Sequence, residues 1–220
     1  MSALWEVVNL IPTKDEWNKA LIKRHGETLQ SKFSSATVAI CGLGGLGSNI
    51  AIALARSGIG KLLLIDYDLV DITNLHRQQY KANQVGMFKT EALSENLKEI
   101  SPYTHIETRN VRVTKENASS LLQNADIICE AFDDAECKAE LVDVVLETMP
   151  DKYIVAASGM AGLGSANSIR TRKITSKFYL CGDEVSDVND DIGLVSPRVM
   201  LCAAHQAHTV LRILAEKFEI

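Results

Sequence analysis

The sequence predicts an α/β fold of the Rossmann-like, doubly wound type, with a mainly parallel sheet. Three observations lead to this prediction. Short apolar runs alternate with segments of helical periodicity, as parallel strands and their crossover helices do. A glycine-rich turn at residues 42–47, GLGGLG, joins the first apolar run to a helical segment. The 220 residues are 46% hydrophobic, enough for a substantial core in one domain over residues 1–220.

The chain is expected to begin with helices. Residues 13–33 are highly charged and carry apolar side chains at helical spacing, namely Trp17, Leu21, Leu29 and Phe33. Such spacing indicates one or two amphipathic helices that pack by one face.

Between residues 36 and 158, strands and helices are expected in strict alternation. We place strands at 36–41, 61–66, 105–113, 126–132 and 152–158, and helices at 48–59, 88–101, 115–125 and 135–149. Ser48 is a good N-cap residue for the first of these helices, and Pro102 ends the second. A β-α-β order repeated in this way predicts the parallel sheet.

The pattern changes after Gly164, in an extension of about residues 165–220. Segments 166–174 and 176–181 alternate apolar and polar residues, which is typical of short antiparallel strands. A closing helix follows Pro197, with one apolar face formed by Val199, Ala203, Val210, Leu214 and Phe218.

Composition excludes several classes of protein. The formal net charge is −5, which argues against a broad surface for nucleic acid. No apolar run approaches the roughly 20 residues that cross a bilayer, and residues 1–17 do not resemble a secretory signal, so we expect a cytoplasmic protein without membrane contact. The five cysteines contain no C-x-x-C pair, and we therefore expect no zinc site.

The glycine loop (residues 42–47) predicts a nucleotide site. Gly42, Gly44, Gly45 and Gly47 allow a tight turn and a close approach of the backbone to phosphate, and the following helix supplies N–H donors. Asp66 ends the second strand about 20 residues later, where a carboxylate can accept hydrogen bonds from ribose hydroxyls. These features suit NAD and ATP equally well.

The residues that follow favour ATP. Polar and cationic side chains gather after the second strand, at Asp66, Asp68, Asn74, Arg77, Gln78 and Lys89. A dinucleotide needs few of them, whereas a triphosphate under attack needs cations and amide donors around its phosphates.

The ordered combination G-x-G-G-x-G, D-x-D-x-V, N-L-x-R-Q and G-x-x-K resembles the ThiF/MoeB/HesA family, relatives of the ubiquitin-activating enzymes. An acidic turn, EAFDDAECK, follows the fourth strand, and the resemblance covers residues from about 24 to 215. The last part, GLVSPRVMLCAAHQA, is most similar to the short bacterial ThiF-type proteins.

The resemblance implies an adenylyltransferase. Its substrates would be Mg-ATP and the C-terminal Gly-Gly carboxylate of a small ubiquitin-fold sulfur carrier, ThiS-like in thiamine synthesis. Arg77 and Lys89 would then hold phosphates with Asn74 and Gln78 close by, and Asp133 would bind Mg²⁺ and contribute to catalysis. Either Asp133 or Asp134 could also cap the next helix.

Two further residues have counterparts in the family's pattern. Some relatives link covalently to the carrier through a cysteine, and Cys181 is the nearest candidate here, although it falls several residues early and lies beside acidic Asp183 and Glu184. The family also implies a homodimer in which an arginine of the partner protomer reaches ATP, and Arg24 is the plausible counterpart.

Other functions stay open at this stage. The carrier could serve molybdopterin synthesis, or the protein could be an ATP-dependent tRNA adenosine dehydratase, although the acidic stretch 182–191 does not suit RNA. An NAD-dependent oxidoreductase would leave Arg77 and Lys89 unexplained. A non-catalytic nucleotide-binding partner would not need Arg77, Lys89 and Asp133 together.

Overall fold

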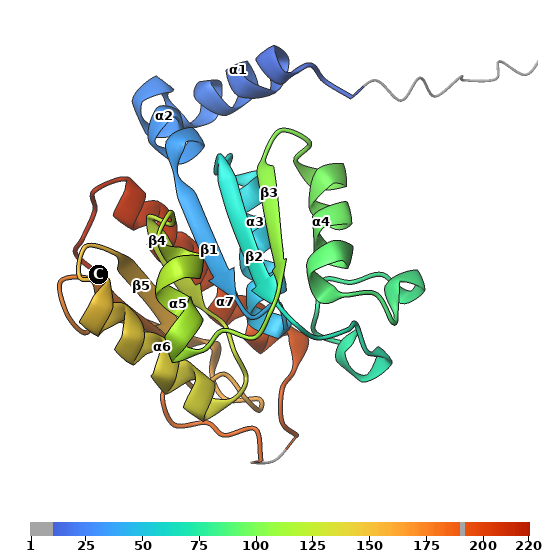
Figure 1. Cartoon of the computed structure of the whole chain (residues 1–220), viewed down its shortest axis with the longest axis vertical. Helices are drawn as coiled ribbons and strands as arrows, with labels where there is room; N and C mark the ends of the chain where they lie inside the picture. Colours follow the sequence, from blue (N-terminus) through green and yellow to red (C-terminus); the bar gives the residue numbers. More distant parts are fainter. Residues whose placement is uncertain (1–10, 190–191) are drawn as a thin grey trace, which may run out of the picture.

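Within residues 11–189 and 192–220, which the computed structural model describes, the strands form one seven-stranded sheet in the order β3-β2-β1-β4-β5-β7-β6 (Figure 1). The strands are β1 Thr37–Cys41, β2 Lys61–Asp66, β3 His105–Asn110, β4 Ile127–Glu130, β5 Tyr153–Ala157, β6 Arg170–Lys173 and β7 Phe178–Gly182. From β1 the chain builds outward to β3, and then returns to the other side of β1 with β4 and β5. This order is doubly wound and confirms the predicted fold class.

The sheet is parallel except at its last strand. The pairs from β3 to β7 are all parallel, and β6 alone runs antiparallel, against β7. The two C-terminal strands are therefore antiparallel to each other as predicted. β7 nevertheless joins the sheet parallel to β5, a detail that the alternating pattern of 176–181 does not indicate.

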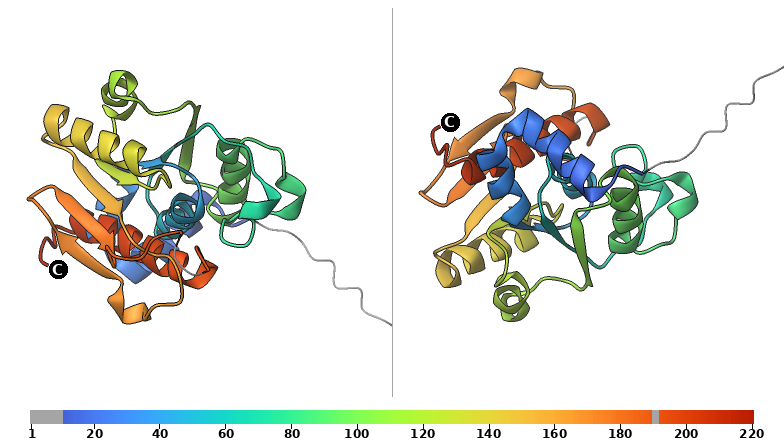
Figure 2. Two further views of the ribbon diagram at one scale, coloured as in Figure 1. Left: turned by 90° about the horizontal axis from the view of Figure 1, so that it is seen from below. Right: turned by 90° about the horizontal axis from the view of Figure 1, so that it is seen from above.

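Helices cover both faces of the sheet (Figure 1, Figure 2). They are α1 Lys14–His25, α2 Glu27–Ser35, α3 Gly45–Arg56, α4 Lys89–Ile100, α5 Lys115–Leu122, α6 Ala135–Thr148 and α7 Ser196–Leu214. Successive residues of β1 face opposite sides. Val38 and Ile40 pack with α3, α4 and α7, whereas Ala39 and Cys41 pack with α5 and α6. Two apolar cores thus hold the sheet between layers of helix.

Several helix boundaries follow from local chemistry. The N-terminal segment forms two helices, and Thr13 caps α1 in a capping box with Glu16. The prediction that Ser48 caps the helix after the glycine loop is wrong, because α3 already begins at Gly45. Ser48 lies in its first turn, fully buried, and its hydroxyl donates to the carbonyl of Gly44 at 2.6 Å.

The closing helix α7 packs against α3, and its predicted apolar face is largely confirmed. Val199, Ala203 and Val210 are buried there. Phe218 lies beyond the end of α7 and stacks on Tyr153. In the described ranges, no helix has both the length and the apolar composition needed to span a membrane.

Candidate functional site

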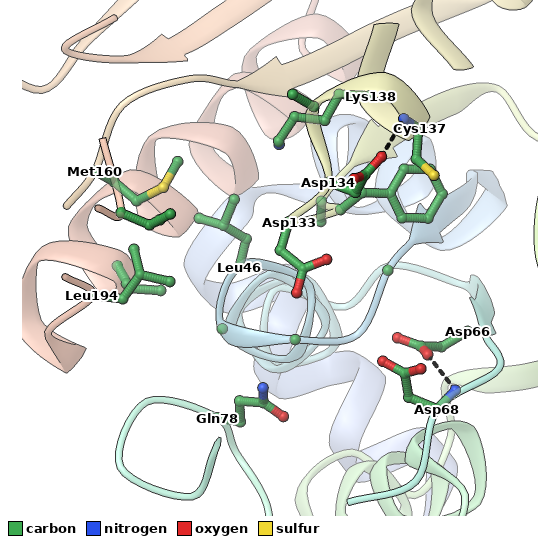
Figure 3. Close-up of a pocket in the computed structure, with 18 of the residues that line it drawn as sticks. Leu46, Asp66, Asp68, Gln78, Asp133, Asp134, Cys137, Lys138, Met160 and Leu194 are labelled. Carbon is green, nitrogen blue, oxygen red and sulfur yellow. Dashed lines mark hydrogen bonds between the residues drawn. The ribbon is translucent and has the colours of Figure 1, made fainter. Parts of the chain in front are cut away.

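A cavity of about 270 Å³ opens at the carboxyl ends of β1, β2, β4 and β5 (Figure 3). Several segments of the chain line it, and their residues include Gly44 after β1, Asp66 at the end of β2, Asp133 after β4, Met160 after β5 and Val188 before α7. This is the point at which the strand order reverses from β1 to β4, where doubly wound folds bind their ligands.

The glycine loop forms the floor of the cavity. Gly42 has a φ of +90°, and a Cβ there would lie 2.7 Å from the carbonyl oxygen of Ala131. A Cβ on Gly47 would lie 1.8 Å from the carbonyl oxygen of Gly42, so this turn requires glycine at both ends. Gly47 itself does not line the cavity, unlike the other three predicted glycines.

Gly44 has a different role. A Cβ at this position would lie 3.7 Å from Nε2 of Gln78, which is ordinary contact distance. Gly44 is the N-cap of α3, and no side chain caps this helix. The N–H groups of its first turn therefore have no side-chain partner at the end of the helix that lines the cavity. Such a terminus binds anions, phosphate in particular.

Asp66 anchors the glycine loop from below. Its Oδ2 accepts the N–H of Leu43 at 2.6 Å, and its Oδ1 accepts the N–H of Asp68 at 2.8 Å. Tyr80 donates its hydroxyl to the carbonyl of Leu43 at 2.7 Å. Burial raises the pKa of Asp66, and the charge of Lys89 and the two N–H donors only partly offset this. The carboxylate lines the cavity, so a loop-anchoring role is compatible with a ribose-binding one.

Lys89 and Asp68 form an ion pair in the cavity wall. Lys89 is the first residue of α4, its side chain is 7% exposed, and its Nζ lies 2.6 Å from Oδ2 of Asp68. Asp68 is about half exposed. Asp68 therefore holds the ammonium of Lys89 at the cavity. If Lys89 binds a ligand instead, water can solvate the carboxylate of Asp68.

Arg77 and Gln78 bring polar atoms that lack partners. The Nη2 of Arg77 donates to Oδ1 of Asn74 at 3.2 Å, while its buried Nε has no hydrogen-bond partner in the described part of the chain. The same is true of the buried Oε1 of Gln78. Buried polar atoms are normally satisfied, so these two indicate a missing ligand or water. Asn74 holds Arg77 and does not itself line the cavity.

Asp133 and Asp134 follow β4, and the sequence leaves open which of the two caps the next helix. Asp134 caps α6, accepting the N–H of Cys137 at 2.8 Å. Asp133 is exposed and lines the cavity, and Figure 3 shows its carboxylate in the middle of the lining residues. Among the described residues, no group of three or more His, Cys, Asp or Glu side chains could hold a metal ion. Any ion at Asp133 would take its other ligands from water or substrate, as Mg²⁺ commonly does.

Two further predicted residues, Cys181 and Arg24, do not line the cavity. Cys181 is fully buried on β7, with its Sγ 3.6 Å from the hydroxyl of Thr171, and burial raises the pKa of its thiol to about 11. Its role as a covalent link stays a prediction, and this burial argues against it. Arg24 lies exposed in the last turn of α1, a helix that Figure 1 shows at the end of the sheet where β1 begins.

Sequence reasoning missed two buried ion pairs near the cavity. Lys138 on α6 pairs with Glu130 at the end of β4, and Arg198 on α7 pairs with Asp183. A glutamate inside the apolar run IICEAF was the available signal for the first pair. Arg198 donates to the carbonyls of Ala161, Gly164 and Ser165. No local sequence pattern distinguishes this arginine from one on the surface.

Comparison with known proteins supports one family. The sequence model of the ThiF family matches residues 18–220. The adenylyltransferase and sulfurtransferase UBA4 of Candida glabrata is 31% identical over 192 residues, which cover 84% of this chain and 44% of the relative. The adenylyltransferase and sulfurtransferase MOCS3 of Caenorhabditis briggsae is 30% identical over 205 residues, which cover 89% and 50%. The chain thus spans about half the length of these relatives.

Solved structures show the same fold. The tRNA N6-threonylcarbamoyladenosine dehydratase TcdA of E. coli, crystallised with ATP, superposes with a TM-score of 0.83 at 22% identity, covering 94% of this chain and 98% of that one. E. coli MccB in complex with MccA gives a TM-score of 0.66 at 22% identity, covering 94% of this chain and 66% of that one. At this level of identity the likeness concerns the fold.

Proposed function

The chain belongs to the ThiF family, and from this premise we propose that it adenylates the terminal carboxylate of a small ubiquitin-fold sulfur carrier with ATP. One observation carries the proposal. An uncapped helix terminus, the cations of Arg77 and Lys89 and the exposed carboxylate of Asp133 converge on one cavity at the switch point of the sheet. The similarity to the adenylyltransferases and sulfurtransferases UBA4 and MOCS3 supports the same chemistry.

The site fits a nucleoside triphosphate with its metal. Asp66 would bind the ribose, the N-terminus of α3 would bind phosphate, and Arg77 and Lys89 would bind the remaining phosphate charge; Asp66, Arg77 and Lys89 all line the cavity, which supports this assignment. Asp133 has an exposed carboxylate for Mg²⁺, and hard oxygen ligands are what this ion prefers. When bound, the metal would supply charge neutralisation to the triphosphate.

The reaction needs orientation more than acid–base catalysis. The acceptor carboxylate is already a nucleophile; it attacks the α-phosphorus, an O–P bond forms, and the bond to pyrophosphate breaks with its electron pair leaving on pyrophosphate. Arg77 and Lys89 offset the charge that develops on the leaving group. The glycine loop and α3 hold the nucleotide so that attack is in line.

ATP–pyrophosphate exchange tests the proposal. The purified protein with Mg²⁺ is assayed with and without carriers ending in Gly-Gly, the first of them ThiS-like. We expect carrier-dependent exchange that is lost in Asp133→Ala. Asp134→Ala is the matched control, because it removes a neighbouring carboxylate that caps α6, a cap worth about 1 kcal/mol, and leaves the carboxylate of Asp133 in place. Exchange that persists in Asp133→Ala would contradict the assignment of this residue.

The same assay separates the alternatives. Exchange with a molybdopterin-type carrier but not with a ThiS-like one would place the protein in the other pathway. Tight Mg-ATP binding without exchange for any carrier would move a tRNA dehydratase or a non-catalytic partner to the front. Protection by NAD and not by Mg-ATP would indicate an oxidoreductase.

We also propose a homodimer in which Arg24 reaches the site of the partner protomer. Within one chain Arg24 belongs to α1, which lies at the end of the sheet where β1 begins, so a contact with the nucleotide requires a second copy. Mixing inactive Arg24→Ala with inactive Asp133→Ala would then restore about a quarter of the activity, since mixed dimers hold one intact site. No recovery on mixing would contradict a role in trans.

A further inference from the structure

The proposed chemistry leaves the buried charge of Glu130, at the end of β4, unexplained. This residue is 1% exposed, and the Nζ of Lys138 lies 3.0 Å from its Oε1 and 3.1 Å from its Oε2. Burial raises the pKa of Glu130, and the charge of Lys138 opposes that change. A buried ion pair is weak evidence for stability in itself, since apolar residues can often replace it. Its position in the sheet gives a better reason for it.

The pair lies where β4 and β5 separate. β4 pairs with β1 as far as Glu130, and β5 pairs with β7 as far as Ala157. Between β4 and β5, however, pairing ends at Cys129 and Val155. The backbone groups beyond that point are buried and cannot bond across the gap, so each needs another partner.

Side chains supply those partners. Oε2 of Glu130 accepts the N–H of Ala157 at 3.4 Å, and Lys138 donates to the carbonyl of Ala157 at 3.1 Å. Gln206 of α7 is fully buried, and its Nε2 donates to the carbonyls of Glu130 and Val155 at 2.8 and 3.1 Å. Three side chains therefore replace the missing ladder and fix how far the two strands are apart.

Both strand ends lead directly into the cavity. Oε1 of Glu130 also accepts the N–H of Phe132 at 2.7 Å, in the turn that carries Asp133. Ala157 is followed by residues 158–161, which form the opposite wall of the cavity. Figure 3 shows Asp133 and Met160 apart from each other among the residues that line the cavity. One carboxylate thus holds both walls.

We propose that Glu130, with Lys138, is a positioning residue that sets the separation between the Asp133 turn and the wall at residues 158–161. It does not line the cavity and acts through the N–H groups of Phe132 and Ala157. The inference rests on the proposed function in one respect: residues 158–161 include none of the residues assigned to the nucleotide, so this wall would receive the acceptor. Glu130 therefore affects the acceptor more than the nucleotide.

Glu130→Gln tests this. The amide keeps the shape of the side chain but replaces one acceptor oxygen by a donor and removes the charge that Lys138 neutralises. We expect the acceptor KM to rise about tenfold and the Kd for Mg-ATP to rise by a smaller factor, because the turn that carries Asp133 also loses a contact. The acceptor KM is measured with a carrier that supports exchange in the wild-type protein. The concentration of active sites is measured separately, by burst titration. Glu107→Gln is the control, since its pair with Lys61 is 2.6 Å long but partly exposed and remote from the cavity.

A purely structural role would give another result. Fewer active sites with unchanged KM for the acceptor would overturn the proposal. Glu130→Leu combined with Lys138→Met removes both charges and guards against a variant that fails to fold; a folded double variant with the same rise in KM supports positioning. If neither variant folds, the pair serves folding and the proposal is overturned.

Failure of the proposed function would be recognised separately, because the wild-type protein would then show no exchange with any carrier. Positioning is still tested by amide hydrogen exchange. In Glu130→Gln the amides of Phe132 and Ala157 should exchange at least about tenfold faster, while those of β1 and β2 keep their rates. Unchanged protection at Phe132 and Ala157 would overturn the inference.

Discussion

The carboxylate of Asp66 accepts the backbone N–H of Leu43 at 2.6 Å, which ties the end of β2 to the middle of the glycine loop. Tyr80 holds the carbonyl of the same residue at 2.7 Å, and Leu43 is fully buried. The loop is therefore fixed through both backbone polar groups of one residue, Leu43, before any ligand arrives. Preorganisation of this kind reduces the entropy lost when phosphate binds.

We predict that Asp66→Asn weakens nucleotide binding by about tenfold or more. The amide cannot accept from Leu43 and Asp68 at the same time, and hydrogen bonds to a charged group contribute about 1.5–3 kcal/mol. Calorimetric titration with Mg-ATP measures the effect. Asp71→Asn is the control, because Asp71 accepts a backbone N–H from Thr73 on the surface. Wild-type affinity in Asp66→Asn would contradict both the anchoring and the ribose role.

Acidification should weaken nucleotide binding through the same residue. Burial raises the pKa of Asp66, so it takes up a proton at a higher pH than the ordinary aspartate value of about 3.9. Protonation weakens the bonds from Leu43 and Asp68 and loosens the loop. Mg-ATP affinity should therefore fall as the pH drops through the raised pKa, and should fall less in Asp66→Asn.

Stability should respond with the opposite sign. The folded state binds this proton more tightly than the unfolded chain, so Asp66 contributes stability below its unfolded pKa, and this contribution is lost as the pH rises through the folded pKa. Urea unfolding of wild type and Asp66→Asn across this pH range isolates the contribution. A difference between the two proteins that does not vary with pH would contradict the shifted pKa.

The glycines of the loop should separate into two classes when changed to alanine. Gly44→Ala places a methyl group in ordinary contact with Gln78, so the free energy of unfolding should stay within about 1 kcal/mol of wild type. That methyl group lies where phosphate must approach the backbone, and we expect Mg-ATP binding to be lost. Gly47→Ala brings a Cβ to 1.8 Å from the carbonyl oxygen of Gly42 and should not fold. Intact binding in Gly44→Ala would contradict the phosphate site.

The cations of the cavity should matter for rate more than for stability. Lys89→Met removes an ammonium whose partner Asp68 is about half exposed and can be solvated. We expect exchange to slow by about 10²- to 10³-fold, as when a donor to a developing charge is removed, with little change in melting temperature. Arg77→Ala should behave alike. Lys81→Met is the control, because Lys81 forms a 2.6 Å pair with Glu99 on the surface; near-normal rates for Lys89→Met would contradict the assignment.

Much of the fold could be predicted because the signals are local. The alternation of Val38, Ala39, Ile40 and Cys41 between two cores belongs to a short apolar strand, and Gly42 and Gly47 mark the turn that follows. The direction in which β7 runs in the sheet, parallel to β5, could not be predicted in this way. Its alternating pattern indicates a half-buried strand, but its neighbour β5 is set by where the long connection after residue 158 returns.

The site was predictable in part for the same reason. Residues at the end of a strand or just after it, such as Asp66 and Asp133, meet at one edge whenever the sheet is parallel. Asn74 accepts a hydrogen bond from Arg77 and does not line the cavity, and its contact with the nucleotide stays a prediction. The partners of Glu130 come from α6, β5 and α7, and no sequence spacing records that these elements meet.

Cys181 should be unreactive in the native protein and dispensable for exchange. Its thiol is fully buried, lies near the hydroxyls of Thr171 and Thr209 and has a pKa raised to about 11, so thiolate is scarce at neutral pH. Cys137, half-buried in the cavity wall, should be alkylated first and be protected by Mg-ATP. Mass spectrometry after brief alkylation measures both. Cys181→Ala should keep exchange within about twofold of wild type, because alanine leaves a small cavity without a new polar group. A carrier adduct on a non-reducing gel that disappears in Cys181→Ala would establish the covalent link after all, and would require β7 to open during the reaction.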